Sequence, residues 1–223
     1  YRDEWKDYSA TRARGEEKVE PRRDLRLEAL VDILEGRILV HSHCYRADEI
    51  LMLLRAAEHY GFQIKTLQHV LEGYKVAAEI AAHGAGPSTF SDWWAYKIEA
   101  YDATPFNGAL LDRAGALTSF NSDSDEMVRR MYAEAAKAVR YGNLDPVRAL
   151  RLVTLNPAVQ LGIGERVGSI EVGKDADLVL LDGEPLSALS KVLVTLVDGE
   201  IEFERRDAFG LDAEPAPVPP LSE

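Results

Sequence analysis

Cysteine and positive charge are both scarce in this chain. Cys44 is the single cysteine among 223 residues, so no disulfide can form within the chain, and this usage is typical of a reducing compartment. Lysine and arginine number 26 against 38 aspartates and glutamates, which gives a net charge of −12. Recognition of nucleic-acid phosphates needs a basic surface. We therefore expect a cytoplasmic protein that has no nucleic-acid partner.

The sequence also lacks a long apolar run and a starting methionine. No stretch is long and apolar enough to cross a membrane, so we expect no membrane partner. Hydrophobic residues still make up 46% of the chain, which is enough for a sizeable core in one domain. Because the chain opens at Tyr1, we expect that the beginning of the parent protein is absent.

The most informative part of the sequence is a set of apolar runs that end in metal-binding residue types. One run ends in His41 and His43, and two later runs end in His69 and Asp123. Alternate residues of a strand share a side, so His41 and His43 point the same way. Barrels built from β/α units carry their chemistry at the carboxyl ends of buried strands. Two imidazoles and a carboxylate at three such ends predict a metal site.

The spacing of these runs predicts an α/β fold with a parallel sheet. Apolar residues recur at helical spacing between the runs, so strand and helix alternate four times, at about 25 to 30 residues a unit. A (β/α) barrel has eight such units in roughly 250 residues, and this chain supplies about half of them. The predicted strands end near His43, His69, Asp92 and Asp123, and the predicted helices cover 24–34, 48–60, 73–82, 104–113 and 124–141.

After these units the pattern changes to turns and short strands. Asp145-Pro146 predicts the start of a helix, which we expect to end at Asn156-Pro157. Apolar runs at 178–181 and 192–197 predict two strands, and Asp198-Gly199 predicts a hairpin turn into a third. This part of the sequence therefore predicts a small all-β unit.

Three motifs in this later part resemble the closing signature of the amidohydrolase superfamily. They are Thr154-Leu-Asn-Pro-Ala158 followed by Leu161-Gly162, then Gly168-Ser-Ile-Glu-Val-Gly-Lys-Asp-Ala-Asp-Leu-Val179, and finally Val197-Asp-Gly-Glu-Ile201. The resemblance runs from about Leu25 to Glu204 and is closest to the imidazolonepropionase-related members. It implies an α/β fold that is the C-terminal half of a (β/α)8 TIM-type barrel, with part of a small β-sandwich domain.

The resemblance divides the chain into four parts. They are a charged helical and loop segment at 1–23, barrel strands five to eight with their helices at 24–165, the C-terminal β-sandwich portion at 166–206 and a proline-rich tail at 207–223. The family's metal centre uses a His-x-His pair on strand one, often a carboxylated lysine on strand four, histidines on strands five and six, and an aspartate on strand eight. The strand-one pair and the lysine have no counterpart in this chain.

By this resemblance, His43 matches the strand-five ligand, His69 the strand-six ligand and Asp123 the strand-eight residue. His41 is the alternative to His43, which lies nearer the strand end. The pair His41-Ser-His43 also fits the strand-one motif itself. However, only four units separate it from the closing signature and no sandwich strands precede it, so strand five is the better interpretation.

The resemblance implies a metal-dependent hydrolase that cleaves a carbon–nitrogen bond in a small molecule, such as an amide, a cyclic amide or an amidine. The expected cofactor is a divalent metal, with zinc as the expected ion. Asp123 would move protons at the reacting atoms, and His69 would bind the metal or polarise the substrate carbonyl. Each histidine taken alone is weak evidence, because a buried, hydrogen-bonded histidine also explains it, and the set of them favours the metal site. Cys44 is expected to be a packed residue, because no base is paired with it.

Four residues near the predicted strand ends are candidates for substrate binding, although a packed loop explains them equally well: Tyr45, Arg46, Trp93 and Trp94. Arg46 is also able to pair with Asp48 or Glu49. The expected macromolecular partner is the missing N-terminal half or another copy of the chain. Two other functions remain open, namely a metal-dependent Xaa-Pro or acyl-amino-acid peptidase and a non-catalytic scaffold of the same fold.

Overall fold

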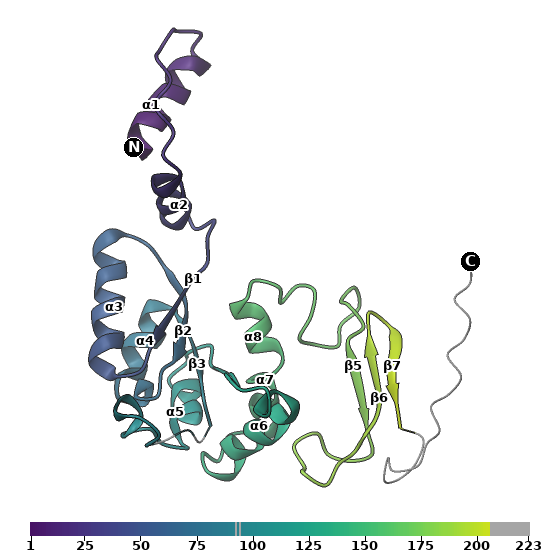
Figure 1. The fold of residues 1–223 in the computed structure, drawn as a ribbon. Helices are drawn as coiled ribbons and strands as arrows, with labels where there is room; N and C mark the ends of the chain where they lie inside the picture. The colour runs from purple at the N-terminus through teal and green to yellow at the C-terminus, as the bar shows by residue number, and fades with distance from the viewer. Residues whose placement is uncertain (92, 94, 206–223) are drawn as a thin grey trace, which may run out of the picture.

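A four-stranded parallel sheet organises the larger part of the computed structural model, which describes residues 1–91, 93 and 95–205 (Figure 1). The strands lie in the order β1-β2-β3-β4, and every neighbouring pair is parallel. Each strand is followed by a helix, so the predicted strand–helix repetition is confirmed. The bounds are β1 Val40–Cys44, α3 Ala47–Tyr60, β2 Ile64–His69, α4 Ala77–His83, β3 Gly86–Thr89, α5 Asn107–Arg113, β4 Ser119–Phe120 and α6 Met131–Arg140.

The largest core cluster lies between β2 and the helices α3 and α4. Ile50 and Leu54 recur at helical spacing on α3, and both pack against Ile64 and Leu67 of β2, with Ile80 of α4 in the same cluster. Each of these five side chains is at most 3% exposed. Burial of an aliphatic side chain of this size stabilises a fold by about 1.5–3 kcal/mol, so this cluster holds the helices on the sheet.

Strand β1 separates an apolar side from a polar side. Its residues alternate in exposure, and Cys44 is buried in the core cluster while His41 and His43 are exposed. The period of two that predicted a common side for the histidines is therefore confirmed. The Nε2 atom of Gln68, on the neighbouring strand β2, lies 3.3 Å from the Nδ1 atom of His41.

The far edge of the sheet is joined to two short helices, α7 Pro146–Arg151 and α8 Leu155–Gln160. The backbone N–H of Phe120 in β4 donates to the carbonyl of Leu152, and Asn156 Nδ2 donates to the carbonyl of Thr118. The predicted helix end at Asn156-Pro157 is wrong, because Pro157 lies in the first turn of α8. The first N–H groups of a helix have no intrahelical acceptor, so proline is tolerated there.

Other predicted boundaries are also wrong after β2 and after β4. The strand predicted to reach Asp123 ends at Phe120, and the helix predicted at 124–141 is a 3-10 turn, η3 Met127–Arg130, followed by α6. Ser124 Oγ accepts hydrogen bonds from the N–H groups of Glu126 and Met127, and such local bonds favour a turn over an α-helix. The helix predicted at 73–82 likewise begins as a 3-10 turn, η1 Gly73–Val76, before α4.

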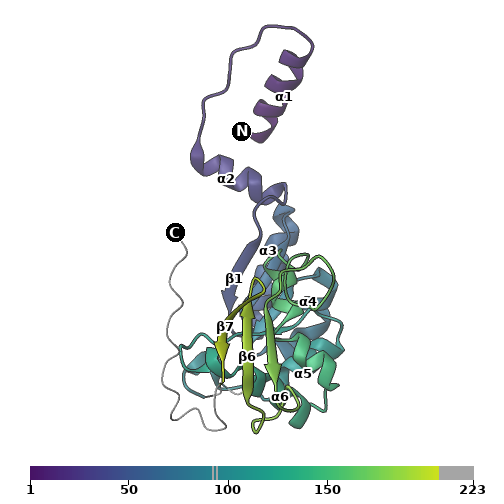
Figure 2. The ribbon, with the colours of Figure 1, turned by 90° about the vertical axis from the view of Figure 1, so that its right-hand side faces the viewer.

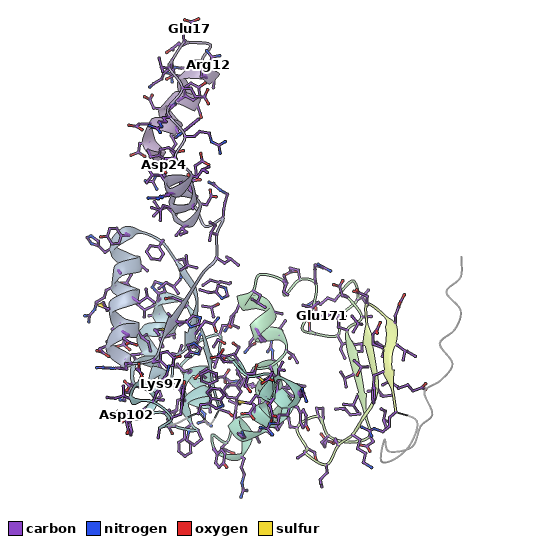
Figure 3. All side chains as sticks on the ribbon, in the orientation of Figure 1. Arg12, Glu17, Asp24, Lys97, Asp102 and Glu171 are labelled. Atoms are coloured by element: carbon purple, nitrogen blue, oxygen red, sulfur yellow. The ribbon has the colours of Figure 1, made fainter. Side chains whose placement is uncertain are left out.

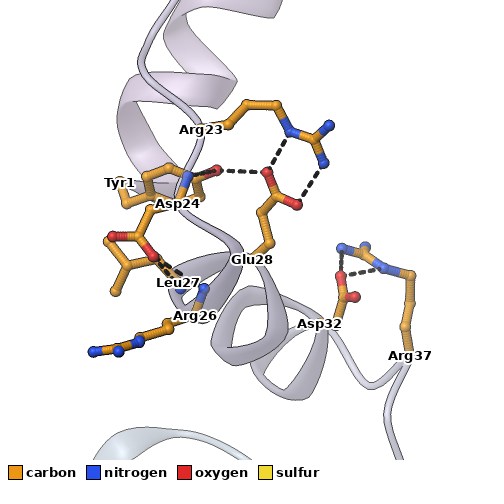
Figure 4. Close-up of polar contacts among 8 residues, drawn as sticks. All are labelled: Tyr1, Arg23, Asp24, Arg26, Leu27, Glu28, Asp32 and Arg37. Atoms are coloured by element: carbon orange, nitrogen blue, oxygen red, sulfur yellow. Dashed lines mark hydrogen bonds and ion pairs between the residues drawn. The ribbon is translucent and has the colours of Figure 1, made fainter.

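The first two helices, α1 Arg2–Ala13 and α2 Leu25–Leu34, form an arm that stands away from the sheet (Figures 1 and 2). Figure 4 shows the contacts that hold this arm together. Asp24, at the start of the predicted helix 24–34, accepts from the N–H groups of Arg26 and Leu27 and so caps α2. Arg23 donates two hydrogen bonds to the carboxylate of Glu28. Arg37, which follows α2, donates to the carboxylate of Asp32 within the helix. No residue of α2 is buried.

The last described part of the chain forms an antiparallel sheet of β5 Leu178–Leu181, β6 Val192–Val197 and β7 Glu200–Glu204. The predicted hairpin is confirmed, since Asp198 and Gly199 join β6 to β7 with φ angles of 51° and 84°. Positive φ at both central residues matches the right-handed twist of the strands. The predicted Asp92 strand end, Trp94 and the tail lie outside the described residues. Within the described part, no helix has the length and hydropathy needed to cross a membrane.

Candidate active site

The structure brings His43 and His69 together at the carboxyl ends of adjacent strands. Strands β1 and β2 pair so that Cys44 lies opposite His69, which places His43 one residue away. The His43 Nδ1 and His69 Nε2 atoms are 2.8 Å apart, and the rings meet edge to face at 76°. His69 is buried and His43 is exposed. Two imidazoles predicted to converge from separate strands therefore do so.

The backbone is strained at two of the three predicted site residues. His69 and Asp123 have φ angles of 75° and 44°, and Val70 follows His69 at 47°. The left-handed region costs side-chain-bearing residues about 1–3 kcal/mol, and such strain gathers at functional sites. Asp123 thus lies in the left-handed conformation three residues after the end of β4.

Asn107, at the start of α5, holds the strained turn after His69 in place. Its Nδ2 donates to the carbonyl of Val70 at 2.8 Å and lies 3.0 Å from Thr89 Oγ1. Its Oδ1 accepts from the N–H of Tyr74 at 2.9 Å. The side chain is only 1% exposed, so water cannot replace these bonds. Sequence reasoning missed Asn107, since an asparagine at a helix start is more simply read as a cap.

His69 lies within a column of stacked aromatic rings. The Tyr45 ring is stacked on His69 at 4.7 Å, and Phe90 is stacked on the same imidazole at 5.2 Å. Trp93 continues the column, 4.6 Å from Phe90. Of the four predicted substrate-binding residues, Tyr45 therefore contacts His69, and Trp93 is separated from His69 by Phe90. Phe90 was not predicted, because a phenylalanine at the end of an apolar run looks like core.

The other predicted substrate-binding residues are not placed in this column. Arg46 donates to both oxygens of Asp48 at 3.1 and 3.0 Å, at the start of α3, which is one of the pairings foreseen from the sequence. Trp94 lies outside the described residues. Cys44 is a packed residue, as expected: burial, and secondarily the charge of Glu49, raises the pKa of its thiol to about 12. It is therefore no nucleophile at neutral pH.

The surroundings of His69 favour its neutral form. Burial is the main cause that lowers the pKa of His69, and electrostatic interactions with His43 and Lys97 lower it further. Asp123 acts in the opposite direction on the pKa of His69, so its carboxylate lies within electrostatic range of the imidazole. A neutral imidazole is the form that binds metal ions, since a protonated ring has no free lone pair.

The residues of this site fit a divalent metal in kind. Two imidazoles and one carboxylate are the donor types and the donor number of a catalytic zinc centre. The Nδ1 atom of His69 is buried and has no hydrogen-bond partner, which marks it as an atom with unused donor or acceptor capacity. Across 1–91, 93 and 95–205, however, no three His, Cys, Asp or Glu side chains lie close enough together to hold an ion.

Comparison with known proteins identifies the family of this chain. Residues 27–202 match the family described as the amidohydrolase family. The chain therefore belongs to the amidohydrolase family, and the resemblance seen in the sequence is confirmed.

Three relatives show how much of a larger protein this chain matches. The amidohydrolase tasK of Hapsidospora irregularis is 31% identical over 207 residues, which are 91% of this chain and 21% of that protein. An imidazolonepropionase of Thermoplasma acidophilum is 37% identical over 118 residues, 48% of this chain and 28% of that protein. The crystal structure of an amidohydrolase from Thermotoga maritima has a TM-score of 0.77 at 32% identity, and the match covers 92% of this chain and 53% of that one. The chain thus spans about half of that structure and less of the other two proteins.

Proposed function

We propose that this chain is part of a metal-dependent hydrolase that cleaves a carbon–nitrogen bond in a small molecule, such as an amide, a cyclic amide or an amidine. The observation that carries the proposal is the His43–His69 pair at the ends of two adjacent parallel strands. Membership of the amidohydrolase family supports it. The strain at His69 and Asp123 also supports it, because a merely structural histidine needs no left-handed backbone.

In this proposal, His43, His69 and Asp123 hold the metal, with zinc as the expected ion and His41 as the alternative to His43. When bound, the metal would lower the pKa of water, so that water becomes a nucleophile at neutral pH. Asp123 accepts a proton from the reacting water and returns it to the leaving nitrogen. Tyr45 is stacked on His69, and Trp93 lies farther along the column, beyond Phe90. Both are candidates for substrate binding, together with Arg46 and Trp94.

We further propose that β1 to β4 are strands five to eight of an eight-stranded barrel, and that β5 to β7 are part of a β-sandwich. The Thermotoga maritima match, which covers about half of that chain, supports this arrangement. Exposed leucines on α2, among them Leu25 at 74% and Leu30 at 54%, need a covering partner. The partner is the other half of the barrel or a second copy of the chain, in a cytoplasmic protein.

The test is hydrolysis by the full-length protein. A panel of amides, cyclic amides and amidines is assayed before and after chelation, and again after zinc is restored. We expect turnover that chelation removes and zinc restores. His69→Ala is expected to be inactive, whereas His59→Ala, a matched change at an exposed histidine of α3, should keep wild-type turnover.

A non-catalytic scaffold is the competing function. It is favoured by the lack of a three-residue metal cluster within the described part of the chain. A full-length protein with no turnover in any metal state would establish the scaffold. Turnover confined to Xaa-Pro dipeptides or acyl-amino acids would instead establish the peptidase.

A further inference from the structure

The carboxylate of Asp123 is not fixed by any side-chain contact of its own. Among the residues that the structure describes, none forms a hydrogen bond or an ion pair with this carboxylate, and the side chain is exposed. The backbone of Asp123 is in the left-handed region, with a φ angle of 44°. A carboxylate that faces an ion and moves protons needs a defined position. The position of Asp123 therefore depends on how the chain beside it is held.

Hydrogen bonds hold the chain on both sides of Asp123. After it, the Ser124 hydroxyl accepts from the N–H groups of the next turn. Before it, the backbone N–H of Asn121 donates to the carbonyl of Thr89 at 3.0 Å. The side-chain Nδ2 of Asn121 donates to the carbonyl and to the hydroxyl of Ser88, both at 3.0 Å. Both N–H bonds of the amide are therefore used, and all of them bind β3.

The bonds of Asn121 connect Asp123 to the strand that lies beside His69. In the register of β2 and β3, Thr89 lies opposite His69. The two β3 residues that Asn121 contacts are at most 5% exposed, so water has little access to these bonds. Figure 3 shows Lys97, which follows β3 in the chain, at the end of the sheet toward which β1 points. Asn121 therefore acts at the same edge of the sheet as the paired histidines.

We propose that Asn121 is a positioning residue, which fixes Asp123 relative to the His43–His69 pair by bonding the end of β4 to β3. This inference rests on the proposed function and adds to it a residue that acts through Asp123. Only one residue separates Asn121 from Asp123, so a shift at Asn121 moves the carboxylate. Loss of an interaction that orients a metal ligand lowers metal affinity by about 10- to 100-fold. A residue that merely stabilised the sheet would have no such effect.

The first measurement is the position of Asp123 in crystals of the metal-free full-length protein. The matched control for Asn121→Ala is Asn156→Ala, which removes a side-chain hydrogen bond to the carbonyl of Thr118, just before the other end of β4. We expect the Asp123 carboxylate to move by about 1 Å in Asn121→Ala, a displacement that costs a catalytic group up to about 10²-fold in rate. It should stay in place in Asn156→Ala. Circular dichroism should show both variants folded.

The second measurement is the zinc affinity of the same proteins, taken by competition with a chromophoric chelator. Asn121→Ala should weaken zinc binding by about tenfold, whereas Asn156→Ala should stay within about twofold of the wild type. In an Asp123→Ala background, Asn121→Ala should have no further effect, because Asn121 acts through Asp123.

The two measurements separate this inference from the proposed function. An Asp123 carboxylate that stays in place in Asn121→Ala would overturn the inference. So would equal zinc affinity of Asn121→Ala and a wild type that binds zinc, or a further loss of affinity in the Asp123→Ala background. A wild type that binds no zinc would contradict the proposed function, and the metal-free crystals would still decide the role of Asn121.

Discussion

A single buried side chain, Asn107, connects β2, β3 and α5 behind the candidate site. Asn107→Ala removes its hydrogen bonds and leaves the Val70 carbonyl and the Tyr74 N–H buried without these partners. We expect the free energy of unfolding to fall by about 2–4 kcal/mol, since each orphaned buried group costs about 1–3 kcal/mol. Urea unfolding measures this loss. A loss below about 0.5 kcal/mol in Asn107→Ala would contradict the role.

Asp123 is expected to act on protons at the metal site as well as to face the ion. In the full-length enzyme, Asp123→Asn should lower turnover by about 10²- to 10⁴-fold, because the amide cannot accept the proton of the reacting water. Much of the metal should remain bound, because the two histidines supply the nitrogen donors. Steady-state kinetics beside elemental analysis checks both expectations. Turnover close to that of the wild type would remove Asp123 from the mechanism and leave it a structural turn residue.

The sequence predicts residues of this site when their position follows from local geometry. His43 and His69 could be predicted because each ends an apolar run, and parallel strands end at the same edge of a sheet. Phe90 and Asn107 could not, because their roles depend on contacts between distant segments. The Tyr45 ring, for example, brings together Lys97 and His69, which are far apart in the sequence.

At the scale of elements, α5 and α7 meet at the buried carboxylate of Asp112, and ionisation of this group lowers the free energy of unfolding at neutral pH. Burial raises the pKa of Asp112, although Arg148 at 2.6 Å lowers it in part. A raised carboxyl pKa gives stability that is fully present below the unfolded value, near 3.8, and is lost as the pH rises through the folded value. The Asp112 contribution to stability should therefore decrease from pH 3.5 to pH 7.

Asp112→Asn isolates this contribution, because the amide does not titrate. Urea unfolding at pH 3.5 and pH 7 gives the change in stability for each protein. Between pH 3.5 and pH 7, we expect the free energy of unfolding of Asp112→Asn to rise more, or to fall less, than that of the wild type. Asp3→Asn, at a carboxylate whose side chain is 90% exposed, should match the wild type. A pH dependence in Asp112→Asn that is identical to the wild type would show that the buried carboxylate is not strained.

Element types could be predicted from the sequence more reliably than element ends. The four strand–helix units, the cap at Asp24 and the hairpin at Asp198-Gly199 follow from spacing and turn chemistry. The start of α6 and the position of Pro157 in α8 do not. A serine that bonds the next N–H groups, or a proline placed in a first turn, changes a boundary without changing the apolar pattern.

At the scale of the whole molecule, the sheet and the arm expose surfaces that a stable monomer normally covers. β1 is an edge strand, and α2 has no buried residue. We expect the 223-residue chain, when expressed alone, to self-associate or to bind the remainder of the barrel when that is supplied. Light scattering coupled to gel filtration measures its mass. A monodisperse monomer that does not bind the remainder would contradict the proposed half-barrel arrangement.

The central claim is that the paired histidines at the ends of β1 and β2 hold a metal ion. The most direct test is the metal content of the full-length protein, measured by elemental analysis for the wild type, His69→Ala and His59→Ala. The account predicts a bound divalent metal, expected to be zinc, in the wild type and in His59→Ala, and a marked loss in His69→Ala. A metal-free wild type, or equal metal content in all three proteins, would contradict it.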